Sequence, residues 1–276
     1  MRVLRVLAAR ELRDGLRNRW VVAVTLLLAT LALALAFVGS APVGQVGASP
    51  LEVVVVSLAS LGILLLPLIA LLLSFDAIVG EAERGTLLLL LAGPVLRWQV
   101  VLGKFLGQVA ILAIATVLGY GAAAAAVALR SGAPDAQATG AFATLVGTSV
   151  LLGAAFTALG LLISVLVRER QTAAGAALGL WLVAAVIYDL ALLGLLVADA
   201  GRYMTPGLLQ GLLLANPADA FRLLNLTGFA GVQALSGMAG LAGDVDPSIP
   251  LMVTVLLLWT ALPLIAATLV FARREP

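Results

Sequence analysis

The chain has 276 residues, of which 63% are hydrophobic and only 11% are charged, with a formal net charge of +2. A soluble domain carries about 25% charged residues, so a water-soluble fold of this length could not bury so much apolar surface. Without a single His or Cys, serine–histidine hydrolysis, HExxH metalloproteolysis and thiolate metal sites are excluded as well.

Six apolar stretches without Lys or Arg are long enough to cross a bilayer, which takes about 20 helical residues. They predict transmembrane helices over 20–39, 53–75, 105–129, 142–167, 172–198 and 251–271. Helices are required because lipid offers no partner for backbone polar groups. The expected fold is an all-α membrane protein with six transmembrane helices, forming one domain over residues 1–276.

An amphipathic segment precedes the first span. Apolar residues recur there at helical spacing, with arginines on the other faces: Leu4, Leu7, Ala8, Leu12 and Leu16. This pattern predicts an interfacial helix whose apolar side lies in lipid, and a plain basic anchor is the alternative. The first span could also be the core of a cleavable signal peptide ending at Gly39-Ser40-Ala41, although its length favours a retained helix.

The basic residues are distributed unequally between the two sides. Thirteen of the sixteen lie in the N-terminal segment, the second and fourth connections and the tail, and the other three are Arg130, Arg202 and Arg222. Connections rich in Lys and Arg stay in the cytoplasm. Both termini are therefore expected to be cytoplasmic, in a multi-pass protein of a bacterial inner membrane.

The cytoplasmic connection 76–104 holds five consecutive leucines, Leu87–Leu91, between charged residues. This run is too short to span. Left in water it would cost several kcal/mol, at about 25 cal/mol per Å² of apolar area. Either the membrane surface or the protein's own helices cover it, or a partner subunit does. Gly85 and Gly93-Pro94 bound a short helix suited to docking in a groove.

One ionisable residue, Asp189, falls within the fifth span next to Tyr188. Charge inside a membrane is costly and tends to be functional. Two readings remain open. Asp189 has a functional role inside the membrane, or it simply reaches the outer interface or caps a partner helix.

The external insert 199–250 is expected to contain two short helices before the last span. Thr205-Pro206 is typical of a helix start, and the apolar residues after it continue to Ala215. Asn216-Pro217, with Asp219 in the first turn, predicts a second helix to about Leu226. Both helices are too short to span.

The chain lacks a Walker A motif. Gly103-Lys104 is followed by Phe105, and Trp98 stands where the first glycine of that motif would be. The chain is therefore not expected to be an enzyme by itself.

The connection resembles the signature of the permeases of the type-two ABC transporter family. The matching residues are Glu81, Glu83, Arg84, Gly85, Thr86, Pro94, Gly103 and Lys104. Six spans, an amphipathic N-terminal segment and a long last external loop also fit this family. The segment Asn216–Asn225 and the chain length are most similar to its members that serve maturation of nitrous oxide reductase.

The resemblance implies a homodimer of this chain in membrane lipid with two cytoplasmic ATPase subunits, which bind ATP and Mg²⁺. This chain would bind no cofactor, metal or nucleic acid itself. The expected ATPase-coupling residues are Glu81, Glu83, Arg84, Gly85, Thr86, Leu87, Leu88, Leu89, Leu90, Leu91 and Pro94, with Arg168, Glu169 and Arg170 as a smaller contact. For Arg168 and Arg170 the alternative role is to set topology alone.

The same resemblance makes copper a candidate cargo, because nitrous oxide reductase contains copper. Copper(I) prefers Cys, Met and His. The only such residues here are Met1, Met204, Met238 and Met252, so no ladder of ligands crosses the bilayer. We therefore expect conformational work or a non-metal cargo, such as a sulfur species, to be passed outward.

The external insert would contact a periplasmic copper-handling protein. The residues expected at this contact are Asn216, Pro217, Asp219, Phe221 and Arg222. An ion-coupled secondary transporter is the alternative function, but such proteins place several charged residues near mid-membrane and only Asp189 is a candidate.

Overall fold

A computed structural model describes residues 2–17, 19–38, 50–93, 95–132, 134–199, 204–226 and 248–274, and within them the chain is helical without strands. Pro94, Arg202 and the glycine-rich stretch 228–246, which contains Met238, lie outside the described residues. The helices are α1 (Arg2–Arg17), α2 (Arg19–Val38), α3 (Pro50–Ser74), α4 (Val79–Glu83), α5 (Thr86–Leu91), α6 (Arg97–Ser131), α7 (Ala136–Leu166), α8 (Arg170–Leu182), η1 (Val183–Ile187), α9 (Tyr188–Asp199), α10 (Pro206–Leu214), α11 (Pro217–Leu226) and α13 (Ile249–Arg273).

Five helical stretches of the described chain are long and apolar enough to cross a membrane. They are Leu51–Glu83, Arg97–Ser131, Ala136–Leu166, Arg170–Asp199 and Ile249–Arg273. Within α2, a shorter apolar run covers Thr25–Leu35. The expected all-α membrane fold is confirmed, while the count of six spans and the side of the termini stay predictions.

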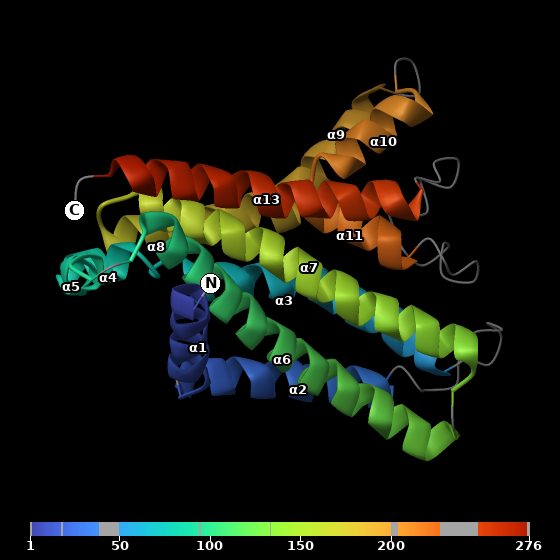
Figure 1. The fold of residues 1–276 in the computed structure, drawn as a ribbon. Coiled ribbons are helices and arrows are strands. Elements are labelled where there is room, and N and C mark those ends of the chain that lie inside the picture. Colours follow the sequence, from blue (N-terminus) through green and yellow to red (C-terminus); the bar gives the residue numbers. More distant parts are fainter. Residues whose placement is uncertain are drawn as a thin grey trace.

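The long helices α6, α7 and α13 run lengthwise along the molecule, and α1 lies across their direction (Figure 1). The amphipathic segment is thus a separate helix packed on α6 and α2. One end of the molecule carries α4, α5 and the C-terminal end of α13 (Figure 1). We call it the basic end, because Arg97, Arg168 and Arg273 gather there around one cavity.

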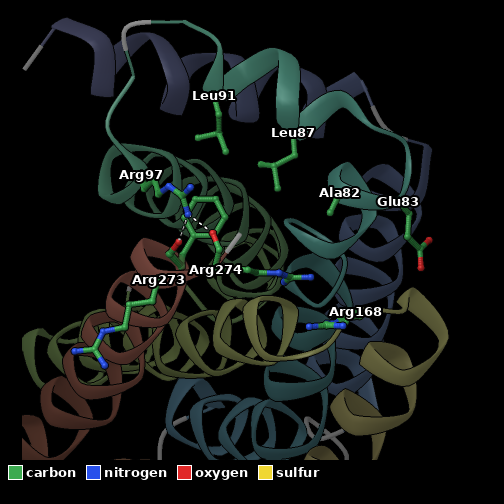
Figure 2. A pocket seen from close by; sticks show the side chains of 9 residues that line it. Ala82, Glu83, Leu87, Leu91, Arg97, Arg168, Arg273 and Arg274 are labelled. Carbon is green, nitrogen blue, oxygen red and sulfur yellow. Dashed lines mark hydrogen bonds between the residues drawn. The ribbon is translucent and has the colours of Figure 1, made fainter. Parts of the chain in front are cut away.

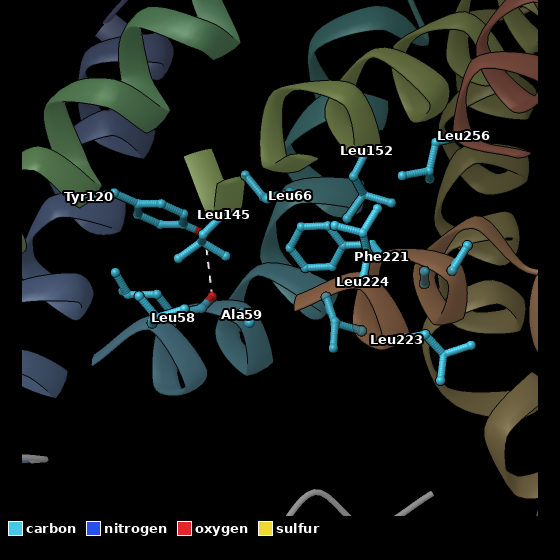
Figure 3. Packing of buried hydrophobic residues seen from close by; sticks show 14 of the residues in the cluster. Leu58, Ala59, Leu66, Tyr120, Leu145, Leu152, Phe221, Leu223, Leu224 and Leu256 are labelled. Atoms are coloured by element: carbon cyan, nitrogen blue, oxygen red, sulfur yellow. Dashed lines mark hydrogen bonds between the residues drawn. The ribbon is translucent and has the colours of Figure 1, made fainter. Parts of the chain in front are cut away.

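The core lies where α3, α6 and α7 meet α11 (Figure 3). Phe221 of α11 is fully buried there with Leu66 and Leu152, so the second external helix is part of the core. Tyr120 is also fully buried, and its hydroxyl donates a hydrogen bond to the Leu58 carbonyl at 3.4 Å.

Two glycines let α7 approach its neighbours closely. A Cβ at Gly153 would lie 1.8 Å from Leu112 Cδ2 of α6, and one at Gly160 would lie 1.9 Å from Ser74 Oγ of α3. Small residues commonly allow such backbone approach in membranes. Larger side chains at these positions would push the three helices apart.

The fifth span is interrupted by the π-helix η1, where the sequence predicted one continuous helix over 172–198. A π-turn leaves helix carbonyls without their usual partner. Within η1, the carbonyl of Ala184 accepts a hydrogen bond from Asn216 Nδ2 at 2.8 Å. The side chain that contacts the π-helix is thus 32 positions away in sequence, which local periodicity cannot reveal.

Candidate functional site at the basic end

The connection after α3 folds into α4, a turn at Gly85 and α5. Gly85 has a φ of 71°, a left-handed conformation that glycine adopts without strain. The backbone N–H groups of Ile78 and Val79 donate to Ser164 Oγ at 2.9 and 3.0 Å, which holds the start of α4 against the end of α7. Thr86 Oγ1 donates to the Glu81 carbonyl at 3.2 Å across the turn.

The five leucines divide into a packed face and an outward face. Leu87 is 3% exposed and packs in a small cluster with Val100, Val165 and Phe271. By contrast, Leu88 is 56% and Leu89 is 77% exposed. The protein's own helices therefore cover only one side of α5, and the other side projects outward at the basic end.

Lys104 of α6 joins the connection to the N-terminal helix. Its Nζ lies 2.8 Å from Glu81 Oε1 and 3.4 Å from Glu11 Oε2, and the lysine side chain is only 8% exposed. Gln108 Nε2 adds a bond of 3.4 Å to Glu11 Oε1. A buried cation flanked by two carboxylates binds three helices, α1, α4 and α6, to one another.

The approach of α1 to α6 depends on two glycines one helical turn apart. A Cβ at Gly103 would lie 2.7 Å from Leu7 Cβ, and one at Gly107 would lie 2.5 Å from Glu11 Cβ. Sequence reasoning noted Gly103 and Lys104 only as a motif and did not identify Glu11. The available signal was that Lys104 is the only lysine, placed on a glycine-bearing face of a long apolar helix.

The two segments expected to contact an ATPase meet in space. Glu83 Oε1 accepts the backbone N–H of Arg170 at 2.6 Å, at the start of α8. The Arg170 guanidinium lies 3.0 Å from Asp76 Oδ2. Arg84, Arg168 and Glu169 are exposed beside them. The structure therefore forms one continuous surface from the two segments, whose contact with an ATPase stays a prediction.

A cavity of about 570 Å³ lies beneath α5 (Figure 2). We call it the arginine cavity, because four of its lining residues are Arg97, Arg168, Arg273 and Arg274. Arg97 NH1 donates to the carbonyls of Phe271, at 2.9 Å, and of Arg274, and Arg274 NH1 donates to the Val165 carbonyl at 2.8 Å. Burial, and next the charge of Arg168, lower the pKa of Arg274.

A second polar cluster lies away from the basic end, where α9 meets α11. Arg222 NH2 lies 2.6 Å from Asp189 Oδ2, and Arg222 NH1 lies 2.6 Å from Asp219 Oδ1. Asn216 Oδ1 accepts the N–H of Ala218 at 3.1 Å at the start of α11, and its amide reaches Asp219 Oδ2 at 3.0 Å. Asp189 therefore has an ionic partner within its own chain.

This cluster faces inward. Asn216, Pro217, Asp219 and Phe221 are buried, and the Arg222 side chain is 14% exposed. In this conformation they hold α11 against the spans, and their contact with an external protein stays a prediction. No group of three or more Asp, Glu, His or Cys side chains that could hold a metal occurs in the described part of the chain.

Comparison with known proteins adds to this geometry. The model of the ABC-2 family transporter proteins matches residues 5–275. The chain is 48% identical to the ABC transporter permease protein NosY of Pseudomonas aeruginosa over 99% of both chains. It is 45% identical to the NosY permease of Stutzerimonas stutzeri over 97% of both.

Proposed function

The chain belongs to the ABC-2 family of transporters as a NosY-like permease of the inner membrane, and from this premise we propose how it works. A separate cytoplasmic ATPase docks on the outward face of α5, and a second copy of the chain completes the permease. ATP and Mg²⁺ are bound by the ATPase. The permease passes the movement outward, as export or as conformational work on a periplasmic partner during maturation of the copper site of nitrous oxide reductase.

One observation carries the proposal, namely the exposed leucines on a helix that is otherwise well anchored. Leu88 and Leu89 together present a large apolar surface at a charged end of the molecule. Burying each such side chain stabilises a complex by about 1.5–3 kcal/mol. A groove on a partner protein would supply that burial, as in other complexes where a helix docks in a groove.

The anchoring of α5 supports a transmission role. Through Lys104 the adjoining α4 is tied to α1 and α6, and through Glu83 it is tied to the start of α8. A displacement of the α4–α5 segment would therefore move the third and fifth predicted spans together. The glycine turn at Gly85 separates α4 from α5 and is the natural place for the two to reorient.

The cluster around Arg222 supports a permease over an ion-coupled secondary transporter. Asp189, the charged residue noted within a span, is held 2.6 Å from Arg222. A carboxylate that is neutralised by a guanidinium is a poor carrier of a proton or cation. The ion pair links the fifth predicted span to α11, so a movement of that span would also move the external insert.

Copurification tests the docking. The chain is expressed with its ATPase subunit and purified in detergent, and the ATPase is expected to remain bound. In a Leu88→Glu/Leu89→Glu variant the ATPase should be lost. Leu129→Glu is the matched control, because Leu129 is 88% exposed on α6 far from α5. Equal retention of the ATPase by the double variant would refute docking on α5.

A transport assay tests what is passed outward. Inverted vesicles that contain the complex are supplied with copper(I) and ATP. We expect ATP hydrolysis without copper accumulation, because no series of soft ligands crosses the membrane in this sequence. Copper uptake that depends on both ATP and this chain would overturn that part of the proposal.

A further inference from the structure

The arginine cavity lies on the side of α5 opposite the face proposed for docking, although two of its lining residues, Glu83 and Arg168, also belong to the surface expected to contact the ATPase. Figure 2 shows Leu87 and Leu91 pointing from α5 towards the arginines. Leu88 and Leu89, the residues assigned to the ATPase, are on the exposed side of the same helix. An occupant of the cavity would therefore lie between α5 and the ends of the membrane helices.

The charge in the cavity is strongly positive. Four of its nine lining residues are arginines, and its one acidic residue, Glu83, already accepts the backbone N–H of Arg170. Within the described residues none of the four arginines forms an ion pair. The pKa of Arg274 is lowered mainly by burial, and further by the positive charge of Arg168. An anion placed among them would relieve this repulsion.

The wall of the cavity favours an anion that has an apolar part. Its lining includes three apolar side chains, Leu87 and Leu91 of α5 and Phe271 of α13. Its volume of about 570 Å³ is in the range of about 300–1,000 Å³ that is usual for small-molecule sites and is much larger than a free phosphate needs. The lining residues Arg97, Arg168 and Arg273 stand at or just beyond the ends of α6, α7 and α13, three helices that are long and apolar enough to cross a membrane.

We propose that the arginine cavity binds the phosphate headgroup of an anionic phospholipid of the cytoplasmic leaflet. Basic pockets between membrane helices on the cytoplasmic side suit such headgroups. Guanidinium groups bind phosphate through paired, charge-assisted hydrogen bonds. The bound lipid supports α5 from beneath, so the position of the ATPase-docking helix depends on the lipid around it.

Native mass spectrometry of the complex tests this binding. The complex is exchanged into detergent with phosphatidylglycerol or phosphatidylcholine, and retained lipid is measured on the permease chain. Phosphatidylglycerol should be retained preferentially. The variant Arg168→Gln/Arg273→Gln removes the two arginines that make no hydrogen bond or ion pair with any described residue, and its affinity should fall at least about tenfold. Lipid retention is compared for the permease with and without the ATPase, so a failed docking proposal leaves the result interpretable.

The matched control is Arg5→Gln/Arg13→Gln on α1. It removes the same charge from exposed positions outside the cavity. Equal loss of lipid in the control would show general surface attraction and overturn the proposal. Inorganic phosphate is the competing ligand. If phosphate displaces the lipid and stabilises the permease against unfolding as much as the lipid does, the cavity binds a soluble anion and the proposal is overturned as well.

A last variant deals with the acidic residue at position 275, which lies outside the described residues. In Glu275→Gln the preference for phosphatidylglycerol should be unchanged. If the preference is absent in the natural chain and appears only in this variant, the cavity is occupied by the protein's own carboxylate and the proposal fails.

Discussion

The Nζ of Lys104 lies 2.8 Å from Oε1 of Glu81, and this pair connects the third predicted span to the segment that carries the exposed leucines. The same ammonium is 3.4 Å from Glu11 on the N-terminal helix. Since the lysine side chain is 8% exposed, water screens these contacts little. One side chain thus holds the interfacial helix and the α4–α5 segment to the same point of α6.

Lys104→Met should destabilise the permease by about 3 kcal/mol, because it removes the cation shared by two partly buried carboxylates, Glu11 and Glu81. Glu81 Oε2 is buried and has no hydrogen-bond partner among the described residues, so no neighbour compensates. Thermal unfolding in detergent and stimulation of the ATPase should both report the loss. Lys104→Arg is the control and should retain most of both. A methionine variant as stable as the natural chain would show that the ion pairs contribute little.

Gly107→Val should displace α1 from α6, because its Cβ would lie 2.5 Å from Glu11 Cβ. Trypsin cleavage at the arginines of α1 should become several times faster once that helix detaches. Gly121→Val on the same helix is the matched control, since a Cβ there meets nothing within 4 Å. Unchanged cleavage of the Gly107 variant would mean that α1 does not depend on this contact.

Arg222→Met should be among the most damaging single changes, at about 3–5 kcal/mol, because it leaves Asp219 buried without its cation. Asp189→Asn should cost less, about 1.5 kcal/mol, since the amide oxygen can still accept from Arg222. Unfolding midpoints of the two variants, measured by tryptophan fluorescence, give the comparison. If Asp189→Asn destabilises the protein more than Arg222→Met does, then Asp189, rather than Asp219, determines the loss of stability.

The natural absence of cysteine makes the orientation directly measurable. Leu89→Cys should react with a membrane-impermeant maleimide only from the cytoplasmic side of oriented vesicles. Gln137→Cys, exposed at the start of α7, should react only from the outside. Labelling of both from one side, or of Leu89→Cys from outside, would contradict the expected topology and with it docking of the ATPase on α5.

Local hydropathy was enough to predict the membrane fold and most of its helices. Each apolar stretch is stabilised by lipid whatever its neighbours are, so its helical state can be read from consecutive residues. The short helix was predicted instead from the run of five leucines between Gly85 and Gly93-Pro94, and α5 forms there over Thr86–Leu91. Gly103-Lys104 was recognised only as part of a family motif. The sequence did not show that this glycine lets α1 pack closely on α6.

Tertiary structure alone decided which charged residues meet. Lys104 pairs with Glu11, 93 positions away, and Arg222 pairs with Asp189, 33 positions away. It also decided that the segment from Asn216 to Arg222 faces inward, and that four arginines from three helix ends and the tail surround one cavity. Such pairings depend on how close helices pack, which glycines such as Gly103 and Gly107 control. Hydropathy along the chain contains no information about distance between helices.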